Sequence, residues 1–402
     1  MIRPLTCLAN GKGLCHPISF RFLEPDDIGS VGLNRQFLKE ATTFTLHRRS
    51  RFLIAELSEE HLVLSTSVKG GGQQRALRYL VNHQSCEATH HLERHDLIKG
   101  MGQEAYHDLV CGEIGLPADE VALLGTAANM NYAAVVVRED RELEVTAAVT
   151  AGVQGNAACA GDPASWRENE VGWEKVNGTI NTLLLINRPL TVGAMARAVV
   201  TMTEAKTAAL QRLAVRSLYS GDPATGTGTD QFAIAAPARG ATPLTSASPH
   251  VKLGELIGSA VRDATLEALR WQNGLEVSYT RSIFTALTRF GLREEKFFDD
   301  IAPYLTEREL ELLRKNSKAV FYEPLTGAAA YAFAAVLDRI RYGTLPENAG
   351  VEALRLQAAV MAASLSTDTQ RWGEFRAQLK DEDPMHLVLH AIALGWAAKW
   401  RS

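Results

Sequence analysis

Short apolar runs separated by polar breaks dominate the first half of the chain, a pattern typical of β-strands. The first two runs cover residues 51–57 and 61–68, and the polar Ser58-Glu59-Glu60 separates them, so we expect a hairpin. A glycine triplet at 70–72 follows, where the backbone must turn tightly or approach a ligand closely. Residues 93–115 then have the spacing of helices.

Three further β-rich runs come next, at 121–124, 132–138 and 143–153. The polar stretch 139–142 lies between the last two runs, which predicts an antiparallel hairpin. The run at 179–187 is almost entirely apolar, as expected for a strand that is buried on both faces.

Longer helical patterns alternate with single strands after this point. We expect a helix over 191–217, a strand over 231–236 and a helix over 251–272. From about residue 281 the strand signals disappear, and apolar residues keep helical spacing to the end of the sequence. We therefore predict two domains, a mixed domain over 1–280 and a helical appendage over 281–402. The appendage is expected to pack against the first domain or to mediate assembly of a homo-oligomer.

Composition and charge narrow the class of protein. The 402 residues are 46% hydrophobic and 22% charged, with a net charge of −4, which is ordinary globular composition. This charge favours neither a nucleic-acid partner nor an anionic membrane. Five scattered cysteines without a CxxC pair, no secretory signal pattern and no apolar run near 20 residues predict a cytoplasmic protein without membrane spans.

Three loops combine small residues with groups that transfer protons. They cover residues 150–163, 220–230 and 245–254, and we expect them to fold together into one pocket. Plain turn chemistry is an equal alternative for Gly-Asp-Pro at 161–163 and again at 221–223. The GTGTD stretch at 226–230 lacks the lysine of a phosphate-binding loop, so nucleotide binding is disfavoured.

Together these loops resemble the adenosylcobinamide amidohydrolase family over roughly residues 25–275. The resemblance is carried by GNAACAGDP at 155–163, GTINTLLLINRPLT at 178–191, TEAKTAAL at 203–210, GTGTDQ at 226–231 and ASPHVKLGE at 247–255, with VKGGG at 68–72. It implies hydrolysis of the amide between the corrin ring system and its aminopropanol arm, as part of cobamide salvage or remodelling. A corrinoid would be the small-molecule partner, and its cobalt belongs to the substrate. No cofactor or metal of the protein itself is expected.

Amide hydrolysis needs a nucleophile, a base, an acid for the leaving amine and donors for the oxyanion. His250 is the simplest proton shuttle near neutral pH, with a capping or substrate-contact role as the alternative. Asp162 and Asp230 are further acid or base candidates. We expect the oxyanion to be held by Asn156 and the glycine amides of 152–155 and 226–228. The full set of expected substrate-binding residues is Gly70, Gly71, Gly72, Asn156, Gly226, Thr227, Gly228 and Lys206. For Lys206 a solvated helix face is the alternative.

The nucleophile has a separate candidate. The strand at 179–187, followed by RPLT and a helix, looks like a segment of the self-processing β-aminopeptidases. That likeness implies Thr179 as nucleophile, with cleavage of the chain before it, in an α+β fold with an αββα sandwich of mixed and antiparallel sheets. The alternative is that Thr179 is an ordinary β-branched strand residue.

A cluster of histidines and cysteines opens a metal-dependent alternative. It comprises His83, Cys86, His90, His91, His95, His107 and Cys111. Spacings of four place pairs on one helix face, but no HExxH motif occurs. We therefore expect no metal site here and favour a polar helix. Three function classes remain: a corrinoid amidohydrolase, a corrinoid-binding protein without hydrolysis, and a zinc-dependent amidase acting on another substrate.

Overall fold

The computed structural model describes residues 35–86, 91–164 and 179–399, and most of the strands form two sheets. The first sheet has the strand order β1-β2-β3-β6-β7. Its strands are β1 (Arg35–Glu40), β2 (Phe44–Arg49), β3 (Phe52–Leu57), β6 (Tyr79–Gln84) and β7 (Val121–Thr126). All neighbours in it are antiparallel except β6 and β7, which are parallel.

The second sheet has the order β5-β4-β13-β11-β9-β8. Its strands are β5 (Gly72–Gln74), β4 (His61–Ser65), β13 (Gln231–Pro237), β11 (Ile180–Ile186), β9 (Leu143–Ala151) and β8 (Ala134–Asp140). The central pair β11 and β13 is parallel, and the other pairs are antiparallel. A separate two-stranded ribbon joins β10 (Ala157–Ala158) to β12 (Gly226–Thr227).

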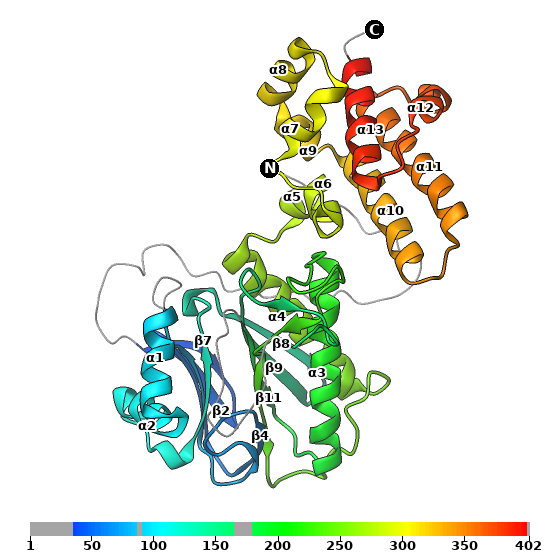
Figure 1. The fold of residues 1–402 in the computed structure, drawn as a ribbon. Helices are drawn as coiled ribbons and strands as arrows, with labels where there is room; N and C mark the ends of the chain where they lie inside the picture. Colours follow the sequence, from blue (N-terminus) through cyan, green and yellow to red (C-terminus); the bar gives the residue numbers. More distant parts are fainter. Residues whose placement is uncertain (1–34, 87–90, 165–178, 400–402) are drawn as a thin grey trace, which may run out of the picture. The chain divides into compact units, whose positions relative to one another are not determined.

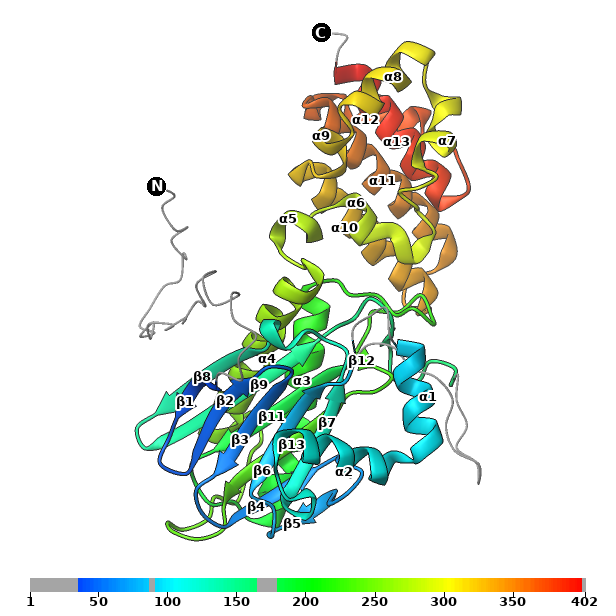
Figure 2. The ribbon, with the colours of Figure 1, turned by 90° about the vertical axis from the view of Figure 1, so that its left-hand side faces the viewer.

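Helices cover the outer face of each sheet, so the predicted αββα sandwich is confirmed (Figure 1, Figure 2). Helices α1 (His91–Met101) and α2 (Gln103–Ile114) lie beside the first sheet, and side chains of α2 pack with residues of β3 and β6. Helices α3 (Val192–Arg212) and α4 (Lys252–Asn273) pack on the second sheet.

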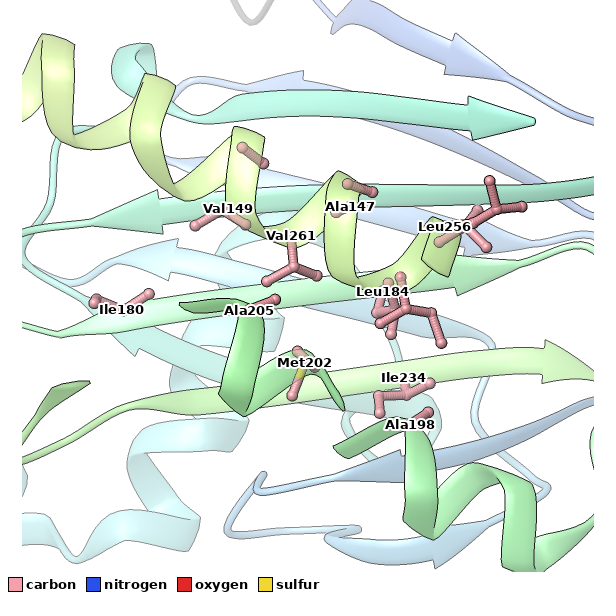
Figure 3. Close-up of a cluster of buried hydrophobic side chains, with 14 of the residues drawn as sticks. Ala147, Val149, Ile180, Leu184, Ala198, Met202, Ala205, Ile234, Leu256 and Val261 are labelled. Carbon is pink, nitrogen blue, oxygen red and sulfur yellow. The ribbon is translucent and has the colours of Figure 1, made fainter. Parts of the chain in front are cut away.

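Alternation along β11 explains why this strand is buried on both faces. Leu183 and Leu185 point into the layer between the sheets, whereas Leu184 and Ile186 point toward the helices. Figure 3 shows Leu184 among side chains of β13, α3 and α4, including Ile234 and Val261. The nearly continuous apolar run at 179–187 therefore has the burial that its composition predicts.

The C-terminal region is helical and has a hydrophobic core of its own, as expected from residue 281 onward. The rings of Phe284, Phe297 and Phe321 meet edge to face at its centre. Its α-helices are α5 (Val277–Thr280), α6 (Ile283–Leu287), α7 (Phe297–Ile301), α8 (Glu307–Lys315), α9 (Ser317–Phe321), α10 (Pro324–Arg341), α11 (Glu347–Ser366), α12 (Trp372–Gln378) and α13 (Pro384–Lys399).

Short 3-10 helices occur at Ala118–Glu120, Met130–Tyr132, Thr288–Phe290, Ala302–Tyr304 and Thr369–Arg371. Across the described ranges, none of the helices has the length and apolar character of a membrane span.

The expected hairpin between residues 51–57 and 61–68 is wrong. Strand β3 pairs with β2 and β6 in the first sheet, whereas β4 pairs with β13 and β5 in the second. Residues 58–60 therefore carry the chain from one sheet to the other, and a polar break alone does not distinguish such a crossing from a hairpin turn. The expected hairpin of β8 and β9 is confirmed, and the helix expected over 191–217 ends at Arg212.

Replacing Leu184 by alanine tests the core between the second sheet and its helices. Leu184 is fully buried, so we expect Leu184→Ala to lower the free energy of unfolding by about 2–5 kcal/mol. Urea titration measures the loss, and Val200→Ala on the exposed side of α3 is the control, expected to change it by less than about 0.5 kcal/mol. Equal effects of the two substitutions would contradict the packing described for β11.

His47 makes stability depend on pH. It is 5% exposed on β2, and burial lowers its pKa from 6.5 to about 4, helped by the positive charges of Arg35 and Arg49 and opposed by Glu56. The unfolded chain takes up this proton near pH 6.5 and the folded chain only near pH 4, so stability falls as the pH drops through that window.

We expect His47→Gln to flatten the pH dependence of unfolding. Between pH 7 and pH 4.5 the free energy of unfolding of the wild type should fall by about 1–3 kcal/mol more than that of the variant. Urea unfolding at pH 8, where residue 47 is neutral in both proteins, isolates any packing effect. Parallel curves down to pH 4.5 would show that His47 is not the group responsible.

Candidate functional site

Thr179 and Asp230 meet at one edge of the second sheet. Each residue comes directly before a strand, Thr179 before β11 and Asp230 before β13. Because these strands are parallel, with Asn181 opposite Gln231, their first residues lie side by side. The backbone N–H of Ile180 donates to Asp230 Oδ1 over 3.0 Å, so the carboxylate is bonded to the segment that carries Thr179.

The Asp230 carboxylate is fully occupied by donors. Its Oδ2 accepts from Lys206 Nζ on α3 and from the N–H of Thr227 at 3.1 Å. Its Oδ1 accepts from Thr227 Oγ1 at 2.5 Å and from the N–H of Ile180. A carboxylate has about four acceptor positions, and all four are in use. Asp230 therefore holds these segments together. It would have to lose one of these four hydrogen bonds before it could accept a proton as a base.

Thr179 is buried, and its hydroxyl has defined neighbours. Its Oγ1 donates to the carbonyl oxygen of Thr229 at 2.5 Å and lies 3.2 Å from Asn181 Oδ1. The hydroxyl therefore belongs to the same group as the Asp230 loop. Residue 178, and with it the bond expected to be cleaved, lies outside the described residues.

Two glycines of the second loop lie close against neighbouring polar side chains. A Cβ at Gly226 would lie 2.5 Å from Asp230 Oδ2 and 2.9 Å from Lys206 Nζ, so only glycine leaves room for this ion pair. A Cβ at Gly228 would lie 3.0 Å from the side-chain amide of Asn156. These glycines let the 226–230 loop lie directly against the polar cluster.

Three of the backbone amides expected to hold the oxyanion are engaged within the protein. The N–H of Gly228 donates to the carbonyl of Asn156 at 3.2 Å, and the N–H of Gly152 donates to the carbonyl of Thr179 at 3.1 Å. The N–H of Thr227 donates to Asp230 Oδ2. In this conformation these amides hold the loops together instead of facing a ligand.

Asn156 links the first loop to the second. Its Oδ1 accepts from the hydroxyl of Tyr219 at 2.7 Å, while its backbone carbonyl accepts from the N–H of Gly228. The side chain is 2% exposed, so Asn156 is a buried bridge between the loops, whereas the ring of Tyr219 is 43% exposed beside it. Tyr219 was not among the residues predicted from the sequence.

Asp162 closes a turn, which was the alternative to a catalytic role. Its Oδ2 accepts from the N–H of Cys159 at 2.7 Å and from Ser217 Oγ at 2.5 Å. Burial alone would raise its pKa, but hydrogen bonds from Ser217, Ser220 and the Cys159 backbone outweigh burial and hold it below its usual value. Asp162 is therefore ionised at neutral pH and fastens the first loop to residues 217–220.

The structure does not bring His250 to this cluster. His250 is exposed just before the N-terminus of α4, whereas the C-terminal end of α4 adjoins the site through Asn273 Oδ1, which accepts from the N–H of Val153 at 3.1 Å. The 22 residues of α4 span about 33 Å. The expectation that all three loops form one pocket is therefore corrected: the loops at 150–163 and 220–230 meet through β10 and β12, whereas the loop at 245–254 contacts α3 at Thr201, whose Oγ1 donates to the carbonyl of Ala247 at 2.7 Å.

Gly70, Gly71 and Gly72 form the turn between β4 and β5 at the same edge of the second sheet. Gly70 and Gly72 have φ values of 68° and 72°, a conformation that favours glycine. A Cβ at Gly71 would lie 2.0 Å from the carbonyl oxygen of Ser67. Turn geometry accounts for all three glycines without a ligand.

A small cavity of about 190 Å³ adjoins the ion pair. It lies between α3 and the second sheet, and Lys206 and Asp230 form its charged side. Its other lining residues are Ile180, Thr182, Met202, Thr203, Gln231 and Phe232. The solvated helix face considered for Lys206 is wrong, because its side chain is 14% exposed and paired with Asp230.

The histidine and cysteine cluster divides between different surroundings. His83 is buried against the ring of Phe52, with the ring centres 4.5 Å apart, and His107 Nε2 lies 3.1 Å from the carbonyl of Ala118. Burial raises the pKa of Cys111 to about 11, so its thiol is protonated at neutral pH. His90 and the side chains of His91 and His95 lie outside the described residues.

Elsewhere in the described part of the chain, single potential ligand atoms of Cys159, Asp162 and Asp222 lie within 4.8 Å of one another. Asp162 already accepts two hydrogen bonds there, and burial raises the pKa of Cys159. We assign no ion to this group.

Sequence reasoning missed a buried polar group beside Thr179. Asn82 on β6, Thr150 on β9 and Asn181 on β11 are hydrogen-bonded between the two sheets. The available signal was Asn181 itself, a polar residue within a strand of leucines and isoleucines.

The chain is similar to one protein family and to individual known proteins. A family model described as adenosylcobinamide amidohydrolase matches residues 35–277. An uncharacterized protein of Methanocaldococcus jannaschii, MJ1613, is 38% identical over 184 residues, which cover 43% of this chain and 71% of that protein. The crystal structure of the PH0078 protein from Pyrococcus horikoshii covers 58% of this chain and 82% of its own at 13% identity, with a TM-score of 0.27. Because the family model spans both sheets and both helical layers, the chain belongs to the adenosylcobinamide amidohydrolase family.

Proposed function

We propose that this protein hydrolyses the amide between the corrin ring system and the aminopropanol arm of adenosylcobinamide. The carbonyl carbon gains the hydroxyl of water, the C–N bond breaks, and the nitrogen leaves with a proton as 1-amino-2-propanol. The other product is adenosylcobyric acid, and the cobalt is carried through unchanged as part of the substrate. We place this reaction in the salvage or remodelling of cobamides in the cytoplasm.

The observation that carries the proposal is the family match over residues 35–277, which contains the Thr179–Asp230–Lys206 cluster. In that cluster a hydroxyl, a carboxylate and an ammonium gather at one end of the strands, and Lys206 and Asp230 also line a cavity. These are the group types that acyl transfer uses for attack and for charge stabilisation.

The size of the cavity limits how a corrinoid would bind. Pockets that enclose small-molecule ligands measure about 300–1,000 Å³. The cavity of about 190 Å³ is smaller, and it lies on the helix side of β11 without Thr179 in its lining, so we infer that the ring system stays outside it. The exposed rings and loops at this edge, including Tyr219, would then face the macrocycle.

We assign attack on the carbonyl to Thr179 Oγ1: the bond from Oγ1 to the carbonyl carbon forms, the C–N bond breaks, and the hydroxyl proton leaves on the amine nitrogen. Water then hydrolyses the resulting ester and restores the hydroxyl. Asp230 and Lys206 would hold the segment carrying Thr179, since the carboxylate is saturated by donors. His250 has no part in this scheme because of its position at the far end of α4.

The direct test is incubation of the purified protein with adenosylcobinamide and detection of released 1-amino-2-propanol. We expect release by the wild type and a loss of at least about 100-fold in kcat for Thr179→Ala, with Thr179→Ser retaining much more activity because it keeps a hydroxyl. Intact mass shows whether the chain is cut before Thr179. Full activity of Thr179→Ala would leave water as the attacking group.

The same assay separates the alternatives. Binding of the corrinoid without release of the amine would indicate a binding protein. Loss of activity with a chelator, restored by zinc, or activity only on unrelated amides, would indicate a zinc-dependent amidase instead.

A matched pair of glycine substitutions tests the packing of the cluster. We expect Gly226→Ala to separate Lys206 from Asp230, to lower the free energy of unfolding by about 1–3 kcal/mol and to reduce hydrolysis. Gly193→Ala on the exposed start of α3 meets nothing within 4 Å and should leave both unchanged or raise stability slightly. Thermal unfolding and the amine-release assay measure the two effects. Wild-type behaviour of Gly226→Ala would contradict the close approach of the loop.

A further inference from the structure

We propose that Asn181, held by Asn82 and Thr150, is a positioning residue that directs the hydroxyl of Thr179. This inference rests on the proposed function and concerns how its attacking group is oriented. All the hydrogen bonds of this network join residues that the structure describes.

The orientation of the Asn181 amide is determined by its neighbours. Its Nδ2 donates to the backbone carbonyl of Gly125 at 3.0 Å and to Asn82 Oδ1 at 2.9 Å. A backbone carbonyl only accepts hydrogen bonds, so the NH₂ group must face Gly125. The carbonyl oxygen of the Asn181 side chain is therefore left to face Thr179 Oγ1, 3.2 Å away.

Asn82 carries this constraint further into the layer between the sheets. Because its Oδ1 accepts a hydrogen bond from Asn181 Nδ2, its own Nδ2 points the other way and donates to Thr150 Oγ1 at 2.8 Å. Thr150 and Asn181 are also direct partners in the pairing of β9 with β11. One consistent direction of donation therefore runs from Thr179 through Asn181 and Asn82 to Thr150.

The burial of this network indicates a role beyond packing. Asn82 and Asn181 are 0% exposed and Thr150 is 1% exposed, in a layer otherwise filled by residues such as Leu80 and Leu183. Replacing both partners of a buried hydrogen bond by apolar groups of the same shape is often nearly neutral for stability. Apolar residues could fill these positions as far as packing alone is concerned, so we attribute a further role to the hydrogen bonds.

The network limits where the single proton of the Thr179 hydroxyl can point. Thr229 O and Asn181 Oδ1 are its two acceptors, and both are carbonyl oxygens. Together they confine the O–H bond and the rotamer of Thr179, which keeps the lone pairs of Oγ1 in one direction. An error of about 1 Å in such an orientation is enough to lower a rate by about 100-fold.

The experiment compares kcat and KM for amine release from adenosylcobinamide. Asn181→Leu should lower kcat by about 10–100-fold and change KM by less than about 2-fold. Thr150→Val, which removes the acceptor for Asn82, should lower kcat by about 3–10-fold, and Thr150→Ser should recover most of that loss because it restores the hydroxyl.

A double variant gives the readout that a merely structural role would not produce. If Asn181 acts through Thr179, then Thr179→Ala/Asn181→Leu should have the same residual kcat as Thr179→Ala alone. Multiplied losses in the double variant would overturn the proposal. Where Asn181→Leu fails to fold by circular dichroism, the Thr150→Val and Thr150→Ser pair decides the question.

The failures of the two proposals are distinguishable. A wild-type protein that releases no aminopropanol overturns the proposed function and this inference with it. An inactive Thr179→Ala beside fully active, folded Asn181→Leu and Thr150→Val variants overturns the positioning role alone. Selective loss of kcat with rescue by Thr150→Ser supports it.

Discussion

The parallel pairing of β11 with β13 is the constraint on which the site depends. Parallel neighbours begin at the same edge of a sheet, so Thr179 and Asp230 are adjacent although 51 positions separate them in sequence. A parallel pair also needs a crossover, and α3 provides it. Its 21 residues run about 31 Å back toward the starting edge, which brings Lys206, near the end of the helix, to Asp230.

The same topology explains why one of the three candidate loops is left out of the cluster. The loop at 245–254 resembles a site by its residue types but follows the opposite end of β13. Strand β13 ends at Pro237, and the chain then pairs Leu244 with Leu190, just after β11 has also ended. The helix α4 starts from that far edge, and only its last residues return to the first loop. Small residues, aspartate and histidine therefore mark a site only where the strand order brings their loops to one edge.

Local sequence patterns predicted most of the fold. They did not predict which strands pair across long distances in sequence. The hairpin of β8 and β9, the buried β11 and the helices α3 and α4 follow from periodicity and turn residues that lie close together in sequence. The assignment of β3 and β4 to different sheets does not, because residues 58–60 have the same polar character in either case. Asp230, Lys206 and Thr179 were identified from the sequence, but Asn82 and Asn181 are 99 residues apart and share no motif.

The network of Asn82, Thr150 and Asn181 also bears on how the two sheets keep their alignment. Apolar contacts such as those of Leu80 and Leu183 tolerate small sliding movements because they have no preferred direction, whereas hydrogen bonds between β6 and β11 do not. Gly125 on β7 adds a second bond from the first sheet to Asn181. Any sliding of one sheet on the other would therefore strain the hydrogen bonds that hold the Asn181 side chain beside Thr179. In this way the position of the proposed nucleophile depends on the first sheet, even though Thr179, Asp230 and Lys206 all belong to the second sheet and its helix.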